Sequence, residues 1–179
     1  MNRIKMVILL FTLSLASQIE LNEETTINFD IQLDQSLNVK IELGHIELES
    51  INQNDQNFTV VSIPNQYYTN TPGAPQLPQI NQLIEIPYEA TPRIEIINIS
   101  EEIYSLNELG FDGVIFPTQP SLSKSANLDN IEFVINNALY SQDKFINTDP
   151  VQIDEKGFLR AVRFGNLMIN PIEYNPVLN

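Results

Sequence analysis

Lys124 stands out chemically, because it is a nearly isolated charge on a loop of small residues. It is the only charged side chain in residues 113–128 and the only basic one in residues 94–143. Ser123 precedes it, and a serine activated by a lysine base is one arrangement for nucleophilic catalysis. A general base must meet its nucleophile in space, however, and adjacent side chains on an extended loop diverge. The pair therefore does not predict a Ser/Lys dyad.

A set of carboxylates precedes this loop and could pair for glycoside hydrolysis: Glu101, Glu102, Glu108 and Asp112. That chemistry needs two carboxyl groups about 5–10 Å apart across a cleft. An acidic chain places many carboxylates near one another by composition alone, and this chain has 23 Asp and Glu against 9 Lys and Arg. The composition therefore favours a solvated acidic surface over a catalytic pair.

His45 is the single histidine, and strand alternation would place it on one face with Glu47 and Glu49. Such a triplet could hold a cation weakly, but a solvated strand face is the commoner fate of charged strand residues. The chain has no cysteine, which excludes a cysteine nucleophile and thiolate metal ligands. We expect no catalytic residue, metal or cofactor in these residues.

The elements that position these residues are predicted to be strands. In residues 27–33 and again in residues 37–43, apolar side chains occupy every second position, and turn-forming residues lie between the two runs. This pattern predicts a half-buried antiparallel hairpin. Gly44 then shifts the phase, so Ile46 and Leu48 are expected to point inward.

The rest of the chain continues this pattern. One weak helical candidate spans residues 100–110, with Ser100 as its cap and Gly110 as its stop. About ten short strands separated by turn residues predict an all-β fold, an antiparallel β-sandwich with Greek-key or jelly-roll-like connections. The further strands are expected at residues 58–63, 81–87, 93–99, 114–116, 130–135, 149–153 and 158–169.

Prolines stiffen two segments. Residues 71–79 contain three prolines, which fix φ and remove three backbone donors, so this segment predicts a rigid crossing and not a central strand. Residues 170–176 end the last long strand in the same way, and Tyr174 within them is expected to be a core or corner aromatic.

The net charge of −14 bears on the partners of the chain. Nucleic-acid binders need clustered Lys and Arg, and anionic lipid surfaces attract basic segments. We therefore expect no nucleic-acid partner and no membrane association of the mature chain. The length of 179 residues allows one core of ordinary size.

The pattern of the N-terminus predicts a secretory signal peptide. Residues 2–5 carry two basic side chains, and residues 6–16 form an apolar run of 11 residues. This run is shorter than the roughly 20 residues that a membrane-spanning helix needs. Ser14 and Ala16 place small residues at the −3 and −1 positions, so we expect a signal peptide over residues 1–16 with cleavage after Ala16. The mature chain is then secreted, either extracellular or periplasmic.

Five motifs occur in a fixed order along the chain: TPGAPQLPQINQLIEIP (71–87), FPTQP (116–120), LYSQDKF (139–145), GFLRAVRF (157–164) and NPIEYNP (170–176). Each is weak alone. Together they resemble the propeptide of the gingipain-type cysteine peptidases over residues 55–178. The resemblance implies a β-sandwich prodomain that precedes a caspase-like peptidase domain, assists its folding and keeps the zymogen latent.

The resemblance also implies a role for Lys124. In arginine-specific members, a basic residue on the loop after the strand that ends in proline enters the specificity pocket of the peptidase. Counted from Pro117, Lys124 occupies the matching position, and Leu122, Ser123 and Ser125 complete the expected inhibitory loop. Lysine is a compact point charge that cannot reproduce a bidentate guanidinium contact. The expected partner is thus the catalytic domain of a gingipain-like peptidase that prefers lysine or accepts both basic residues.

The chain departs from the family at its end, since members continue past the position of Asn179 with further strands and the peptidase. The implied domain spans residues 17–179, truncated at its C-terminal end, and is not an enzyme. The chain is then a truncated precursor, a fragment or a stand-alone propeptide-like protein. The parent precursor would be a cysteine-type endopeptidase. Missing strands would leave a sheet edge unpaired.

One alternative function comes from a different class. A surface β-sandwich could bind carbohydrate or a host protein, and this reading expects exposed aromatic side chains on one sheet face. The candidates are Tyr67, Tyr68 and Tyr88, and the chain has no tryptophan.

Overall fold

The computed structural model describes residues 16–32, 36–124 and 131–179, and its secondary structure is almost entirely β. The strands of the described residues form three sheets, and their one helix, α1 (Asn137–Tyr140), is four residues long. Apart from Ala16, the predicted signal segment 1–16 lies outside the described residues. The described part of the chain has no helix that is long and apolar enough to cross a membrane.

The first sheet has the order β1-β4-β5-β8, with β1 (Ala16–Glu20), β4 (His45–Gln53), β5 (Gln56–Ser62) and β8 (Val114–Ile115). β4 and β5 form an antiparallel hairpin, whereas β8 pairs with β5 in parallel. The hairpin turns at Asn54 and Asp55, whose φ angles are 53° and 61°. Asn and Asp tolerate this left-handed conformation better than other residues with a side chain.

The second sheet has the order β6-β7-β10-β9, with β6 (Tyr67–Tyr68), β7 (Pro78–Glu85), β10 (Val162–Ile169) and β9 (Val151–Leu159). All its pairs are antiparallel. The prediction of one strand over residues 158–169 is wrong, because the chain turns at Arg160 (φ 58°) and the two halves belong to β9 and β10.

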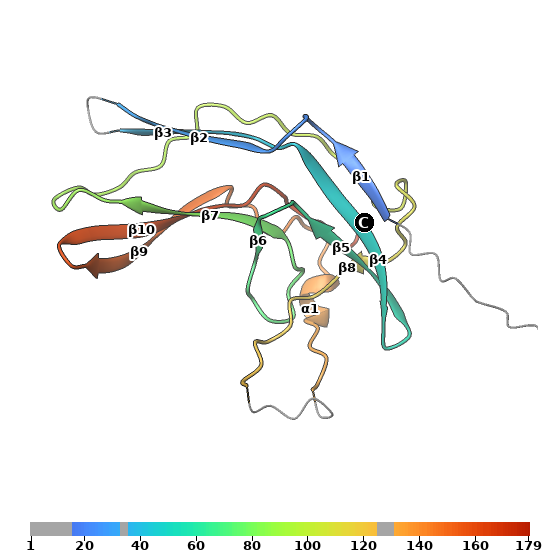
Figure 1. Cartoon of the computed structure of the whole chain (residues 1–179). Helices are drawn as coiled ribbons and strands as arrows, with labels where there is room; N and C mark the ends of the chain where they lie inside the picture. Colours follow the sequence, from blue (N-terminus) through green and yellow to red (C-terminus); the bar gives the residue numbers. More distant parts are fainter. Residues whose placement is uncertain (1–15, 33–35, 125–130) are drawn as a thin grey trace, which may run out of the picture.

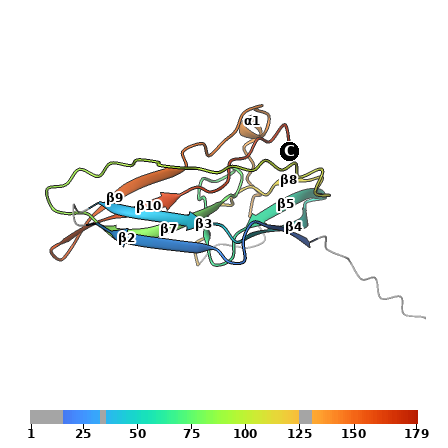
Figure 2. The same ribbon diagram turned by 90° about the horizontal axis from the view of Figure 1, so that it is seen from above.

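The third sheet is the hairpin β2 (Thr26–Ile31) and β3 (Leu37–Glu42), as the alternation of residues 27–33 and 37–43 predicts. It lies over the sheet β7-β10-β9 (Figure 1), and both run in the same direction when seen from above (Figure 2). Ile27, Val39 and Ile41 pack on Ile80, Leu167 and Ile169 of that sheet. The hairpin extends beyond this contact, which leaves Phe29 40% and Ile31 79% exposed.

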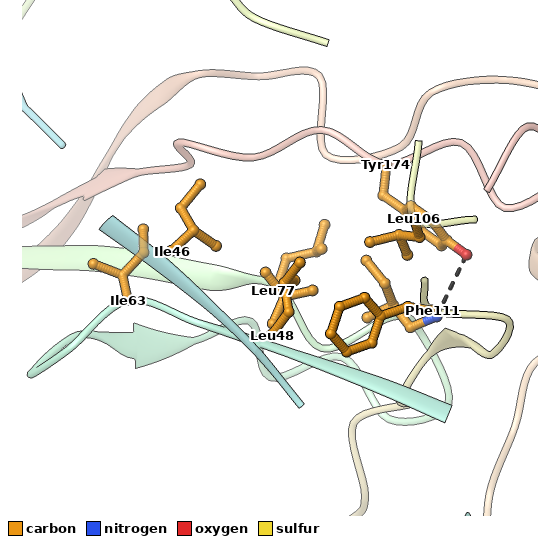
Figure 3. Packing of buried hydrophobic residues seen from close by; sticks show 9 residues of the cluster. Ile46, Leu48, Ile63, Leu77, Leu106, Phe111 and Tyr174 are labelled. Atoms are coloured by element: carbon orange, nitrogen blue, oxygen red, sulfur yellow. Dashed lines mark hydrogen bonds between the residues drawn. The ribbon is translucent and has the colours of Figure 1, made fainter. Parts of the chain in front are cut away.

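The main hydrophobic core joins the first sheet to segments from the middle and end of the chain (Figure 3). Ile46 and Leu48 of β4 are buried in it, which confirms the predicted change of phase after Gly44. Tyr174 is buried as expected, and its hydroxyl accepts a hydrogen bond of 3.4 Å from the Ile115 amide. The remaining buried members are Val61, Ile63, Leu77, Leu106, Phe111 and Ile115.

Gly44 changes the phase because the chain comes very close to itself there. A Cβ on Gly44 would lie 2.4 Å from the Thr25 backbone nitrogen and 2.5 Å from the Glu24 carbonyl carbon. Backbone atoms cannot yield to such a contact, so only glycine fits. The Gly44 amide also donates to the Thr25 hydroxyl at 2.9 Å. The three sheets confirm the all-β sandwich expected from the sequence, in which every strand pair except β5–β8 is antiparallel among the described residues.

Several expected elements are absent from the described residues. Residues 93–99 do not form a strand although their isoleucines alternate, and Ile97 is 86% exposed. Residues 131–135, the described part of a predicted strand, are not paired as a strand either. Residues 100–110 do not form the candidate helix, because residues 106–110 form turns and residues 100–105 have no regular structure. The helix is instead α1, where the Asn136 side chain accepts from the Leu139 amide.

Candidate functional site

The expected inhibitory loop leaves the fold directly after β8. Its first arm is fixed on both sides, because the Phe116 amide donates to the Thr59 carbonyl and the Phe116 carbonyl accepts from the Gln76 amide, both at 2.8 Å. Two residues later Thr118 exchanges backbone bonds of 2.8 Å with residues 73 and 74. The first arm is thus held between β5 and the proline-rich segment 71–79.

The proline-rich segment also holds the returning arm of the loop. Asn136, at the start of α1, donates its amide to the Gly73 carbonyl at 2.9 Å. Gly73 has a φ of 78°, and a Cβ on it would lie 3.0 Å from the Asn136 nitrogen. Glycine is favoured there by both the conformation and the close approach. Pro75 completes the arrangement by forming an antiparallel bridge with Pro117.

Gln119 joins the two arms to each other. Its side-chain oxygen accepts from the Val134 amide at 2.9 Å, and its side-chain nitrogen donates to the Val134 carbonyl at 3.0 Å. The same nitrogen donates to the Pro117 carbonyl at 2.9 Å. One side chain thereby satisfies both backbone groups of Val134, as a neighbouring strand would do. We call this set of bonds the Gln119 clamp.

Below the clamp, three phenylalanines pack together from three different segments. The ring centroids of Phe58 and Phe116 lie 5.6 Å apart with the planes at 87°, an edge-to-face contact. Phe133, on the returning arm, lies 5.5 Å from Phe58 and 5.7 Å from Phe116. Such pairs contribute about 0.5–1.5 kcal/mol each beyond their burial. The base of the loop is therefore packed as well as hydrogen-bonded.

The loop projects away from the sheets, with its yellow and orange arms side by side at the bottom of Figure 1. Beyond the clamp, Leu122 is 51% exposed, and Ser123 and Lys124 are exposed as well. No hydrogen bond or ion pair joins Lys124 to another residue of the described ranges. Ser125, the last expected member of the inhibitory loop, lies outside the described residues. The described end of the loop thus presents a cation on a fixed base.

The other sequence candidates do not assemble into a site. His45 Nε2 lies 3.7 Å from a Glu47 carboxylate oxygen, and Glu49 is exposed on the same strand. Among residues 16–32, 36–124 and 131–179 there is no group of three His, Asp or Glu side chains that could hold a metal.

The carboxylates considered for hydrolysis are exposed, as a solvated surface requires. Glu102 accepts a short hydrogen bond from the Tyr104 hydroxyl, and this bond raises the pKa of that phenol. All four carboxylates lie at exposed positions: Glu101, Glu102, Glu108 and Asp112.

The loop can be predicted from the sequence, but the groups that hold it cannot. Gln119 lies inside the FPTQP motif, between two prolines, and no periodicity marks it. The aromatic cluster was equally hidden, because Phe133 falls in a segment whose alternation predicts a strand. The one available signal is that Phe58, Phe116 and Phe133 each lie within a predicted strand, at residues 58–63, 114–116 and 130–135.

Comparison with known proteins identifies the family. The family Propeptide_C25 matches residues 22–179. Lys-gingipain and Lys-gingipain HG66 of Porphyromonas gingivalis are each 35% identical over 136 residues, which cover 76% of this chain. The same stretch covers only 8% of either relative. The comparison thus concerns a small part of much longer proteins.

Two solved structures share the fold. A structure described as giving insight into the zymogenic latency of gingipain K matches with a TM-score of 0.79 and 31% identity, over 92% of this chain and 91% of that one. A complex of the RgpB pro- and mature domains matches with a TM-score of 0.56 and 18% identity, over 92% and 72%. The second likeness shows the fold alone. The chain belongs to the Propeptide_C25 family and is a non-catalytic prodomain of the gingipain type.

Proposed function

We propose that this prodomain keeps a gingipain-like cysteine endopeptidase latent by inserting Lys124 into its active-site cleft. The observation that carries the proposal is an exposed lysine on a loop whose two arms are joined by the Gln119 clamp. Leu122 and Ser123 on one side and Ser125 on the other would occupy the cleft beside it. The chain contributes no catalytic group to this interaction.

The physical basis is a charge-assisted contact made at low entropic cost. A lysine ammonium that reaches an acidic group contributes about 1.5–3 kcal/mol net. A loop with a fixed base loses less conformational freedom on docking than a free peptide does. The whole chain carries a net charge of −14, so most of its surface repels an acidic pocket. The positive charge of Lys124 attracts that pocket and thereby directs it to this loop.

The relatives support a lysine preference. The curated matches are named Lys-gingipain, and the basic residue of this chain's expected inhibitory loop is a lysine, Lys124. We propose that the partner peptidase prefers lysine at its primary specificity pocket. The RgpB structure is described as a complex of pro- and mature domains, which is a precedent in that protein for docking of the two parts.

Export and folding assistance complete the proposal. Residues 1–16 would direct secretion of the precursor and be removed after Ala16, so that the prodomain acts in the periplasm or outside the cell. The rigid all-β body would offer a template on which the peptidase folds. Lys124 would contribute to latency and not to this templating.

The test is inhibition of a lysine-preferring gingipain-type peptidase by the purified chain. We expect Lys124→Ala to raise the inhibition constant about 10- to 150-fold, which corresponds to the contact energy above. Lys124→Arg should fall between the two in a lysine-specific pocket. Lys144→Ala, which removes another exposed lysine, is the matched control and should inhibit as the wild type does. An unchanged constant for Lys124→Ala would overturn the proposal.

Folding assistance is tested separately, by refolding the denatured peptidase with and without the chain in trans. We expect the wild type and Lys124→Ala to increase the yield of active peptidase equally, once the chain is removed. If neither variant increases the yield, the folding role is wrong while the latency role stands on its own assay.

A further inference from the structure

The outer face of the second sheet carries a groove that the inhibitory loop does not use. It has a volume of about 460 Å³ and lies across β6, β7, β10 and β9. This volume falls in the range of about 300–1,000 Å³ that small-molecule sites occupy. The groove faces away from the β2–β3 hairpin, since the side chains that pack on that hairpin, Ile80 and Leu167, alternate with those that line the groove.

The floor of the groove is a ladder of side-chain amides from neighbouring strands. Asn166 donates to Asn81 at 2.8 Å, Asn81 donates to Gln79 at 3.2 Å, and Gln79 donates to Asn170 at 2.9 Å. Asn170 in turn donates to the Asp149 carbonyl at 2.7 Å. Each link fixes the orientation of the next amide, so the ladder is set before any ligand arrives.

The ladder leaves hydrogen-bonding capacity unused. A side-chain amide has two donors and an oxygen with two lone pairs. Asn81 and Gln79 each use one donor and one lone pair within the ladder, and the Asn166 oxygen has no partner among the described residues. Both free donors and free acceptors therefore remain among the amides that line the groove. A ligand whose groups can each donate and accept fits this pattern, and hydroxyl groups do both.

Aromatic side chains border the ladder on one side. Tyr67 and Tyr68 of β6 line the groove, and Tyr67 is 66% exposed. Met168 adds an apolar, adaptable surface beside the amides. The exposed aromatic ring forms an apolar wall and the amides form a hydrogen-bonding wall. A pyranose ring matches both, because its C–H face can stack on the aromatic ring while its hydroxyl groups bond to the amides.

The charge of the groove points to a neutral ligand. Its lining contains one acid and one base, Asp154 and Lys156, and these two side chains form an ion pair with each other. No unpaired cation lines the groove, among the described residues, that could hold a sulfate or carboxylate. The strongly acidic chain around it would repel such groups.

We propose that this groove binds a neutral oligosaccharide, with Tyr67 stacked on a sugar ring and the Asn81–Asn166 amides bonded to its hydroxyl groups. The site is independent of the inhibitory loop. The prodomain would then have a second binding surface, by which the precursor is held at a glycan while its peptidase is latent.

The experiment is a glycan array probed with the fluorescently labelled chain, followed by titration of the best neutral oligosaccharide by calorimetry. We expect binding to neutral hexose-containing glycans and none to their sulfated or sialylated counterparts. Tyr67→Ala should weaken binding by about tenfold, the loss of one stacking contact with its buried area. Tyr88→Ala is the matched control, because Tyr88 is also exposed but packs on Phe158 outside the groove.

NMR spectroscopy tests the role of the amide ladder without a variant that could unfold. In an ¹⁵N-labelled chain, the side-chain NH₂ signals of Asn81 and Asn166 should shift on adding the sugar, while that of Gln82 should not. An array with no neutral hit, equal binding by Tyr67→Ala, or preferential binding of anionic glycans would overturn the proposal. Weaker inhibition of the peptidase by Tyr67→Ala would also overturn it, because the groove would then belong to the interface with the peptidase.

Discussion

Replacing Gln119 with alanine is expected to loosen the base of the inhibitory loop while leaving Lys124 in place. The variant loses two bonds to Val134, of 2.9 and 3.0 Å, and one to the Pro117 carbonyl. A net value of about 1 kcal/mol for each bond to Val134 gives a loss of about 2 kcal/mol. In a domain of this size that loss lowers Tm by about 4–8 °C.

The same loss predicts a change in inhibition. If the clamp holds the two arms in the arrangement that docks, removing about 2 kcal/mol weakens inhibition by up to about 30-fold. The assay measures the thermal unfolding of the full chain and its inhibition constant against a lysine-preferring peptidase. Gln82→Ala is the control, since Gln82 makes one exposed bond of 3.1 Å to the Leu83 carbonyl. A Gln119→Ala chain with the melting temperature and inhibition constant of the wild type would refute the reasoning.

Two further predictions concern stability and local order. Burial raises the pKa of Tyr174 to about 12, and burial also raises the pKa of Tyr140. Since the folded values lie above the unfolded value of about 10, this contribution to stability is complete below pH 10 and lost as the pH rises through about 12. Urea unfolding should therefore show falling stability above about pH 10, less steeply in Tyr140→Phe; an identical slope would contradict it. Separately, hydrogen exchange should be fast at residues 93–103, whose backbone amides donate no hydrogen bond within the described ranges, and slow in β7. Equal protection of the two segments would contradict the unpaired arrangement.

The sequence predicted elements well where local pattern and burial agree. Residues 27–33 and 37–43 alternate strictly, and the structure pairs Ile27 with Ile41 as that alternation requires. Gly44 interrupts the alternation, and the close backbone approach there explains why. In both places the information is local, so a reading of the chain alone could recover it.

Residues 93–99 show where local pattern fails. Their isoleucines alternate as in a strand, but a strand also needs a neighbour for its backbone groups, and none pairs with them in the described residues. The turn at Arg160 was missed for a related reason, because apolar residues on both sides of it read as one strand. Strand pairing is a long-range property that alternation does not encode.

The candidate site likewise has local features that the sequence indicates and long-range contacts that it does not. The isolated charge of Lys124 and its spacing from Pro117 can be found in the sequence, because both are local features. The Gln119 clamp joins residues 15 positions apart in the chain, and Phe58 lies much further from Phe133 than that. Such contacts depend on the whole fold, so no local feature of FPTQP could have indicated them.

The most direct test of the account is the structure of this prodomain bound to a lysine-preferring gingipain-type peptidase. We expect Lys124 Nζ to lie within hydrogen-bonding distance, about 2.7–2.9 Å, of an acidic oxygen in the primary specificity pocket. The Gln119 clamp should be unchanged in the complex. A structure in which Lys124 points into solvent, with another residue or water in the pocket, would contradict the account.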